Sequence, residues 1–492
     1  MNSIAYQPEF RPALPTVFGA KEYREFREIL EQMDRLLIQT GVEHRMITES
    51  IALAEGSTTV FQQHTYRRYR TGLRYCILLG ITGCSYRELS MRASDSLLFQ
   101  WFSYTDGLAG AKTLSKSSIE RYEKLFSDEA ISQLIHDLNR AVADEQQVQE
   151  LLYQEAAVKM DRIFADTTCV QSNIHFPVDW VLLRDAARTI MKAIMLIRQQ
   201  GLYHRIGDPQ SFLRKMNTLC IEMTHTRKKK GALKARKQVL RRMKRLMHVI
   251  TAHGQNYYQL LRERWEETDW SEAEAQIVGD RIKSILDQLP DAIVQAHERI
   301  IGGRRVLNTE KILSLYEPDV RIMVRGKAGA EVEFGNALYL AEQADGLIVD
   351  WQFIQEQPPG DNRLVPASVE RIQVNYGAIG SYTADRGFDS QENSIDLEAL
   401  EIINGICPRS VPALQQRLED TEFCRLQKRR GATEARIGIF KHAYLGKPLR
   451  SKGFTHRSTR IHWCILAHNL WKLGTMAAQR LKEIAEAAEK TA

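Results

Sequence analysis

The sequence has few cysteines, and their arrangement excludes two common kinds of site. Seven cysteines are scattered over 492 residues, and none of them forms a Cys-x-x-Cys pair. Zinc ribbons need such pairs, and disulfide frameworks are typical of short secreted chains with an even number of cysteines. We therefore expect free thiols in a reducing, intracellular compartment.

Long apolar runs are also missing. No run approaches the roughly 18 apolar residues that indicate a membrane-spanning helix, and the stretch MNSIAYQPEFRPALP has no apolar signal core. We expect neither export nor membrane insertion. The hydrophobic fraction of 43% is typical of globular proteins, and a chain of this length is expected to form about two to four domains.

Proline is absent between Pro15 and Pro177, and this absence favours helices. Apolar residues in YREFREILEQMDRLLIQ recur with the helical period of about 3.6 residues. Ser85 and Glu88 stand in the N-cap and capping-box positions of another helix. We predict a helical N-terminal domain over residues 1–150. Its segment TYRRYRTGLRY interleaves bases with aromatics, which fits either a DNA contact or a packed helix whose arginines reach solvent.

Acidic residues are absent between Glu222 and Glu263, whereas eleven Lys and Arg occur between Arg227 and Arg245. The whole chain carries a net charge of +7, so the rest of it is net acidic. Such a block suggests a polyanionic partner, nucleic acid before membrane, although a solvated helix face is the alternative. The bases expected to contact DNA are Lys228, Lys229, Lys230, Arg241, Arg242 and Arg245.

The same region has the pattern of a long helix. Apolar residues from Leu233 to Leu261 recur at steps of three, four or seven. Arg236 and Gly254 interrupt this stripe. We interpret residues 178–305 as an all-helical insertion.

Strand patterns lie on both sides of this insertion. KMDRIFADTTCVQSNIHF is β-branched and aromatic-rich, and it predicts a strand that ends near Asp166, followed by a second extended piece. The runs 332–341 and 347–355, joined by QADG, predict a β-hairpin. We therefore predict an α/β core with a mixed sheet flanked by helices, built from residues 151–177 and 306–455. A C-terminal helix follows over residues 456–492.

Two aspartates and one glutamate are the candidate metal ligands. Asp166 follows the apolar run RIFA, and Asp385 follows GSYTA. Glu434 lies in RRGATEARIGIFK, where Arg430 is about 40° and Lys441 about 20° from it around a helix. Three carboxylates suit Mg²⁺ or Mn²⁺, which takes oxygen ligands and leaves positions for water and phosphate. An ordinary Arg430–Glu434 helix pair is the alternative.

Two other acids are alternatives within the same segments. Asp161 stands near the start of the first strand and faces the opposite side from Asp166. Asp389 follows the turn after Asp385 and is expected to begin a helix.

These segments together resemble the DDE transposases of bacterial insertion sequences, whose core has a ribonuclease H-like fold. FADTTCVQSNIHFP resembles the first-aspartate block, TADRGF the second, and RRGATEARIGIFK matches R-x3-E-x6-K of the glutamate signature. The signature tyrosine is replaced by Gln427, which leaves the phosphate-handling role of that tyrosine unassigned. The helical segment SYRELSMRASDSLLFQWFSY resembles the domain that often precedes such cores, where it binds DNA or mediates dimerisation.

The resemblance implies a function and a site. Asp166, Asp385 and Glu434 would hold two Mg²⁺ or Mn²⁺ ions, while Arg430, Lys441 and Arg386 would contact DNA phosphates. The implied reaction is hydrolysis at a transposon end, followed by attack of the freed 3′-hydroxyl on a target strand. The implied partners are double-stranded DNA, as terminal inverted repeats and target, and a second copy in a synaptic homodimer. The implied location is the bacterial cytoplasm, at the nucleoid.

Alternatives remain open from the sequence. A ribonuclease H-like nuclease without strand transfer would use the same residues, and a non-catalytic DNA-binding relative would not need them. His175 is either a further ligand or phosphate contact, or simply a hydrogen-bonded residue.

Overall fold

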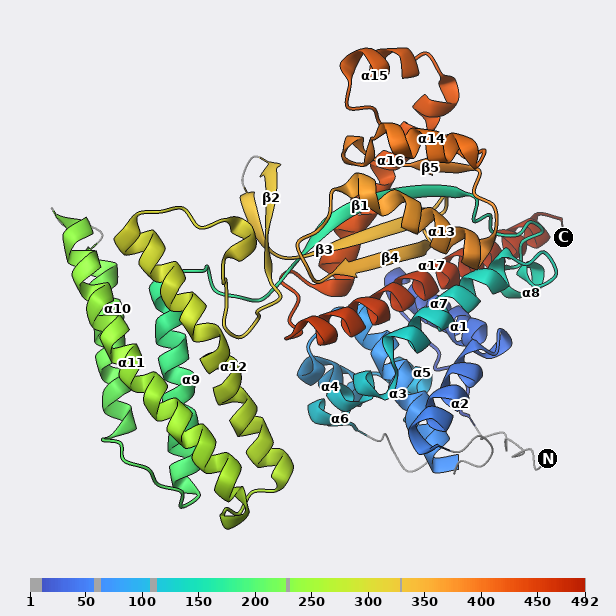
Figure 1. Ribbon diagram of the computed structural model, residues 1–492. Helices are drawn as coiled ribbons and strands as arrows, with labels where there is room; N and C mark the ends of the chain where they lie inside the picture. Colours follow the sequence, from blue (N-terminus) through green and yellow to red (C-terminus); the bar gives the residue numbers. More distant parts are fainter. Residues whose placement is uncertain (1–10, 57–62, 107–112, 227–230, 328–329, 492) are drawn as a thin grey trace. The chain divides into compact units, whose positions relative to one another are not determined.

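The computed structural model describes residues 11–56, 63–106, 113–226, 231–327 and 330–491. By its internal contacts the chain divides into two compact units. The first unit comprises residues 1–172 and 336–492, and the second comprises residues 173–335. Figure 1 shows that the first unit contains both sheet and helices, whereas the second is mainly helical.

The helices expected in the N-terminal part are present in the first unit. The Ser85 hydroxyl accepts a hydrogen bond from the Glu88 amide at 3.2 Å, which confirms the predicted N-cap. The helices are α1 (Lys21–Gln39), α2 (Val42–Glu55), α3 (Gln63–Thr82), α4 (Tyr86–Asp95), α5 (Leu97–Ser103), α6 (Lys116–Tyr122), α7 (Asp128–Ala143) and α8 (Val148–Leu152).

The sheet is open and mixed. Its strands are β1 (Arg162–Gln171), β2 (Arg321–Lys327), β3 (Ala330–Gln343), β4 (Ile348–Ile354), β5 (Ser381–Thr383) and β6 (Ile403–Asn404). The order is β2-β3-β1-β5-β6, with β4 also paired to β3. Strands β3 and β4 form the predicted antiparallel hairpin, whereas β5 runs parallel to both β1 and β6.

The first strand differs from its prediction. β1 runs without interruption to Gln171, so Asp166 lies inside the strand and not at its end. The sequence TTCVQ after Asp166 is β-branched and continues the extended backbone. The neighbouring strand β5 is the one that ends early, at Thr383.

Helices cover both faces of this sheet. On one face Tyr339 of β3 and Tyr382 of β5 share a hydrogen bond of 2.7 Å, and Tyr339 also bonds Ser368 of α13 (Val365–Tyr376). On the other face the guanidinium of Arg429, in α16 (Thr421–Ile439), lies 4.5 Å from the centre of the Phe164 ring. The remaining short helices are α14 (Gln391–Ala399) and α15 (Val411–Arg417).

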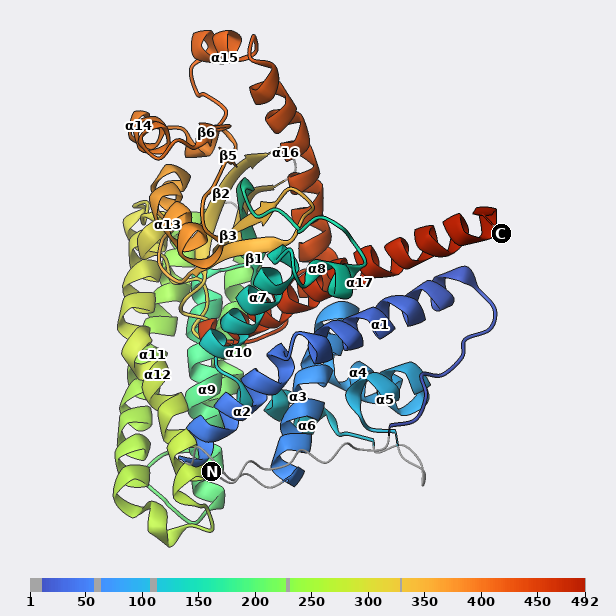
Figure 2. The same cartoon turned by 90° about the vertical axis from the view of Figure 1, so that its right-hand side faces the viewer.

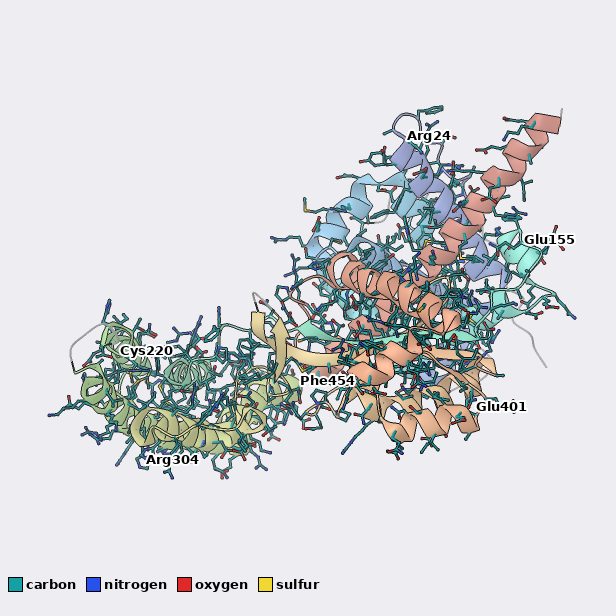
Figure 3. All side chains as sticks on the ribbon, turned by 90° about the horizontal axis from the view of Figure 1, so that it is seen from above. Arg24, Glu155, Cys220, Arg304, Glu401 and Phe454 are labelled. Atoms are coloured by element: carbon teal, nitrogen blue, oxygen red, sulfur yellow. The ribbon has the colours of Figure 1, made fainter. Side chains whose placement is uncertain are left out.

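The C-terminal helix α17 (Phe454–Thr491) passes between the sheet and the N-terminal helices (Figure 2). Phe454, labelled in Figure 3, begins this helix, and its ring stacks on Phe353 of β4 at 4.6 Å. Asn469 of α17 bonds both the amide and the carbonyl of Ile348 in β4. It also donates to Asn139 of α7. These buried contacts join the N-terminal helices and the sheet into one unit.

The second unit contains four long helices, α9 (Asp179–Gln199), α10 (Pro209–Thr226), α11 (Ala232–Arg264) and α12 (Glu272–His297). The predicted stripe of α11 is buried from Leu240 to Leu261, but Leu233 is exposed because it lies in the first turn of the helix. Gly254 lies within the stripe, since a Cβ there would come within 2.9 Å of Ile190 of α9. Among the described residues, no helix is long and apolar enough to cross a lipid bilayer.

Candidate active site

Pairing between β1 and β5 brings the two aspartates to the same place. Phe164 is the register partner of Thr383 in this parallel pair. Two residues further along each chain stand Asp166 and Asp385, so both side chains point to the face on which Phe164 lies. That is the face covered by α16. The aspartates therefore meet at the carboxyl end of β5, beneath the helix that carries Glu434.

The two alternative aspartates lie elsewhere. Asp161 precedes β1, and its carbonyl accepts hydrogen bonds from the amides of Gly380 and Ser381, at the opposite end of β5. Asp389 accepts a hydrogen bond of 2.8 Å from the Arg409 amide. It does not begin a helix, because Ser390 is the N-cap of α14. Neither Asp161 nor Asp389 therefore replaces Asp166 or Asp385 as a candidate ligand.

A chain of hydrogen bonds connects α16 to the end of β5. The side-chain amide of Gln427 donates to the carbonyls of Ala384 at 3.1 Å and Gly405 at 2.6 Å. Its oxygen accepts from Arg430 at 3.1 Å, and Arg430 donates in turn to Glu434 at 2.7 Å. Gln427 thus connects Arg430 to the backbone at the end of β5. No pattern in the sequence indicated this bridge.

The opposite polar face of α16 holds the helix on the sheet. Arg429 and Arg436 each form an ion pair with Glu342 of β3, at 3.1 Å and 2.9 Å. Thr433 donates to the same carboxylate at 2.7 Å. Glu342 is buried, so these bonds compensate the cost of removing its charge from water. The sequence carried no signal for Glu342, because a lone acid in a strand predicts no partner.

The pKa of Asp166 responds to both of the other candidate acids. Burial raises the pKa of Asp166 to about 6. The Thr167 amide lowers this pKa, the charges of Asp385 and Glu434 raise it, and Arg430 lowers it. Both other acids and the arginine therefore act on the carboxyl group of Asp166.

Each carboxylate is held by one hydrogen-bond donor. Asp166 Oδ1 accepts from the Thr167 amide and Asp385 Oδ1 from the Gly387 amide, both at 2.7 Å. Glu434 Oε1 accepts from Arg430. The second oxygen of each accepts no hydrogen bond from the described residues, and it is therefore available to another ligand.

The donor set fits a hard divalent cation. Carboxylate oxygens are the ligands that Mg²⁺ and Mn²⁺ prefer, and a cation would relieve the repulsion that raises the pKa of Asp166. In the part of the chain that the structure describes, no three His, Cys, Asp or Glu side chains are grouped closely enough to hold a metal ion by themselves. The side chain of Glu434 is 57% exposed, and its carboxylate is held by Arg430.

Three other residues were predicted for this site: Lys441, Arg386 and His175. Lys441 lies beyond the end of α16, in a π-helical turn (η7, Phe440–Leu445). The wider turn invalidates the angle of 20° expected for a continuous α-helix. Arg386 is exposed and directly follows Asp385. His175 is exposed too, in the loop after β1 and outside any strand.

The structure describes only part of the basic block between Arg227 and Arg245, and one of its exposed arginines forms an ion pair. Arg241, Arg242 and Arg245 are exposed on α11, but Arg242 pairs with Glu222 of α10 at 2.8 Å. Lys228, Lys229 and Lys230 lie outside the described residues.

Comparison of the chain with protein-family models, with curated proteins and with solved structures gave no match in any of the three.

Proposed function

We propose that this protein is a DNA transposase that cleaves the ends of an insertion sequence and joins them to target DNA. The β1–β5 register, which brings Asp166 and Asp385 to the same end of β5, is the observation that carries this proposal. The charges of Asp385 and Glu434, which both raise the pKa of Asp166, support it. Two carboxylates beside the carboxyl end of β5 and a third on the covering helix α16 suit metal-dependent phosphoryl transfer.

The topology supports a ribonuclease H-like core. The antiparallel hairpin β3–β4 lies on one side of β1, and the parallel strands β5 and β6 lie on the other. The helical insertion separates the segment that carries Asp166 from the segments that carry the other two acids.

Asp166, Asp385 and Glu434 would hold two Mg²⁺ or Mn²⁺ ions. Bound there, such ions activate a water molecule and neutralise charge on the reacting phosphate. Arg430, oriented by Gln427, presents a guanidinium beside Glu434 and can donate to phosphate oxygens. Lys441 and Arg386 are further candidates for such contacts.

The reaction consists of two in-line displacements at phosphorus. Water attacks a phosphodiester at the element end, which breaks the bond to the 3′-oxygen and leaves a 3′-hydroxyl and a 5′-phosphate. The 3′-hydroxyl then attacks a target phosphodiester and displaces its 3′-oxygen. Positioning supplies most of the catalysis in such reactions, and no bond between protein and DNA forms. Two ends must be paired, so we propose a synaptic homodimer on double-stranded DNA.

The substitution Glu434→Gln tests the site. It keeps the shape of the side chain but removes a ligand charge, so we expect cleavage of DNA to fall at least about a hundredfold. Binding of labelled duplex should stay within a fewfold of wild type. Glu422→Gln is the matched control, because Glu422 lies on the same helix and also pairs with an arginine. Cleavage that survives in Glu434→Gln would mean that this glutamate is misassigned.

Metal binding gives a second readout. Calorimetric titration with Mn²⁺ should detect binding to the wild-type chain and much weaker binding to Asp166→Asn and Asp385→Asn. Equal binding to all three proteins would contradict the proposed ligand set.

Product analysis separates the candidate functions. The substrate is a plasmid in which the coding sequence keeps its flanking genomic DNA, where we expect inverted repeats. Joined products with Mg²⁺ indicate a transposase, and nicks alone indicate a nuclease. Binding without any metal-dependent cleavage indicates a non-catalytic relative.

A further inference from the structure

A basic groove lies between α9 and α10 in the second unit, apart from the basic block of α11. It has a volume of about 200 Å³ and is lined by Arg184, Arg188 and Lys192 of α9 and by Gln210, Arg214 and Asn217 of α10. Cys220, labelled in Figure 3, marks α10. No carboxylate lines the groove among the described residues.

Two of the four cations in this groove form ion pairs, and the other two form none with the described residues. Arg184 pairs with Asp185 at 3.1 Å and Arg214 with Asp208 at 3.0 Å. The Arg214–Asp208 pair is exposed, and such pairs contribute little and are easily exchanged for another anion. The Arg184–Asp185 pair is partly buried. Arg188 and Lys192 are exposed and form no ion pair with the described residues. The groove therefore has an excess of positive charge, centred on these two side chains.

The spacing of the cations suits a regularly charged polymer. Arg184, Arg188 and Lys192 follow one another at four-residue steps, so they lie within about 80° on one side of α9 and span about 12 Å of its axis. One strand of duplex DNA carries about three to four phosphates over that length, at one per 3.4 Å. Gln210 and Asn217 add neutral donors on the facing helix.

We propose that this groove binds the phosphate backbone of double-stranded DNA, with Arg188 and Lys192 as the principal contacts. The contacts go to phosphates and so position DNA without reading its sequence. The proposal rests on the proposed function only for the choice of DNA as the polyanion.

The test is the salt dependence of DNA binding. The full chain is titrated with a fluorescein-labelled duplex of arbitrary sequence, by anisotropy, over a series of salt concentrations. In the double variant Arg188→Gln/Lys192→Gln, we expect weaker binding and a slope of log K against log salt that is lower by about 1.8, or about 0.9 for each phosphate that is no longer neutralised. An unchanged slope would overturn the proposal.

The control is Arg281→Gln/Lys283→Gln. Both residues are exposed on α12 of the same unit, and this variant changes the net charge equally. It should keep the wild-type slope; an equal fall in both variants would mean that total charge, not the groove, is responsible.

A second probe addresses another polyanion. Vesicles of phosphatidylserine and phosphatidylcholine should bind wild type and the groove variant alike. If only vesicle binding depends on Arg188 and Lys192, the groove serves a membrane and the proposal fails. The two proposals fail in different ways. If the groove proposal is wrong, wild type still cleaves DNA with metal, but the salt slope of the groove variant is unchanged. If the transposase proposal is wrong, wild type does not cleave DNA, but the difference between the salt slopes remains.

Discussion

Arg74 lies wholly inside the first unit, although it belongs to the base-rich and aromatic segment TYRRYRTGLRY. Its guanidinium donates to both oxygens of Glu43, at 2.7 Å and 2.8 Å, and to Asp34. Arg70 of the same segment is buried over the Tyr104 ring at 3.7 Å. The segment is therefore a packed helix, but these two arginines do not reach solvent as that interpretation expected. Arg74 forms ion pairs and Arg70 stacks on an aromatic ring inside the core.

The substitution Arg74→Met should destabilise the protein strongly. It leaves two buried carboxylates without their shared cation, so we expect the free energy of unfolding to fall by about 3–5 kcal/mol. Urea denaturation measures this change. Arg68→Met, at an exposed position of the same helix, should stay within about 0.5 kcal/mol of wild type. Equal stability of the two variants would contradict the buried ion-pair network.

Gln427 acts on the proposed site through Arg430 and is therefore a positioning residue. Gln427→Met keeps the length of the side chain but removes its bonds to Ala384, Gly405 and Arg430. Because a hydrogen bond to a charged group contributes about 1.5–3 kcal/mol, we expect the rate constant of cleavage to fall about tenfold or more.

The apparent affinity of this variant for DNA should change little, and Gln416→Met on α15, an exposed position, is the control. If Gln427→Met cleaves DNA at the wild-type rate, the hydrogen bonds of Gln427 do not contribute to catalysis.

At the scale of elements, the contacts of α16 account for the position of Glu434 among the basic residues of RRGATEARIGIFK. Three of its arginines divide between two faces: Arg429 and Arg436 hold Glu342, while Arg430 holds Glu434. The first set fastens the helix to the β3–β4 hairpin, and Arg430 is joined through Gln427 to the carboxyl end of β5. The ion pairs with Glu342 therefore hold α16 on the sheet, while Glu434 on another face of the helix stays exposed.

Packing between α3 and α17 leaves no room for a side chain at Gly80. A Cβ there would lie 2.5 Å from the Cβ of Ala467 and 3.2 Å from the Trp463 carbonyl. Gly80→Ala should therefore separate the two helices and cost about 1–3 kcal/mol. Gly431→Ala is the contrasting variant, because its Cβ would meet nothing within 4 Å. It should stabilise α16 by about 0.5–1 kcal/mol, since alanine favours a helix over glycine.

Thermal unfolding of both glycine variants measures these changes. Opposite shifts of the transition are expected. Stabilisation by Gly80→Ala would show that the helices are not packed so closely.

At the scale of the whole molecule, α17 is the element on which the first unit depends. It contacts α1, α3, α7 and β4, and it buries Trp463 and Asn469 completely. Arg460 of α17 pairs with the buried Glu123, which also bonds His456 and Tyr86. The N-terminal helices and the sheet thus share one core, although they lie far apart along the chain.

Removal of α17 should prevent folding of the first unit. A chain that ends at residue 453 loses this shared core, so we expect it to be insoluble or to lack a cooperative unfolding transition. A chain that ends at residue 482 omits a segment that is exposed over residues 483–490, and it should unfold like the full chain. Circular dichroism distinguishes these outcomes, and cooperative unfolding of the shorter chain would contradict the shared core.

Local patterns in the amino-acid sequence account for the capped helix after Ser85, the β3–β4 hairpin and the long helix α11, because periodicity, turn residues and caps act within a few residues of each other. The choice of the three acids rested on the family resemblance as well as on local patterns, and it stays a prediction. Long-range packing set the remaining features: Gln427 bridges to Ala384, and Glu342 fastens α16 to the sheet. These features depend on strand pairing and on buried polar contacts between residues far apart in the chain, and no local pattern encodes which distant group will satisfy a buried charge.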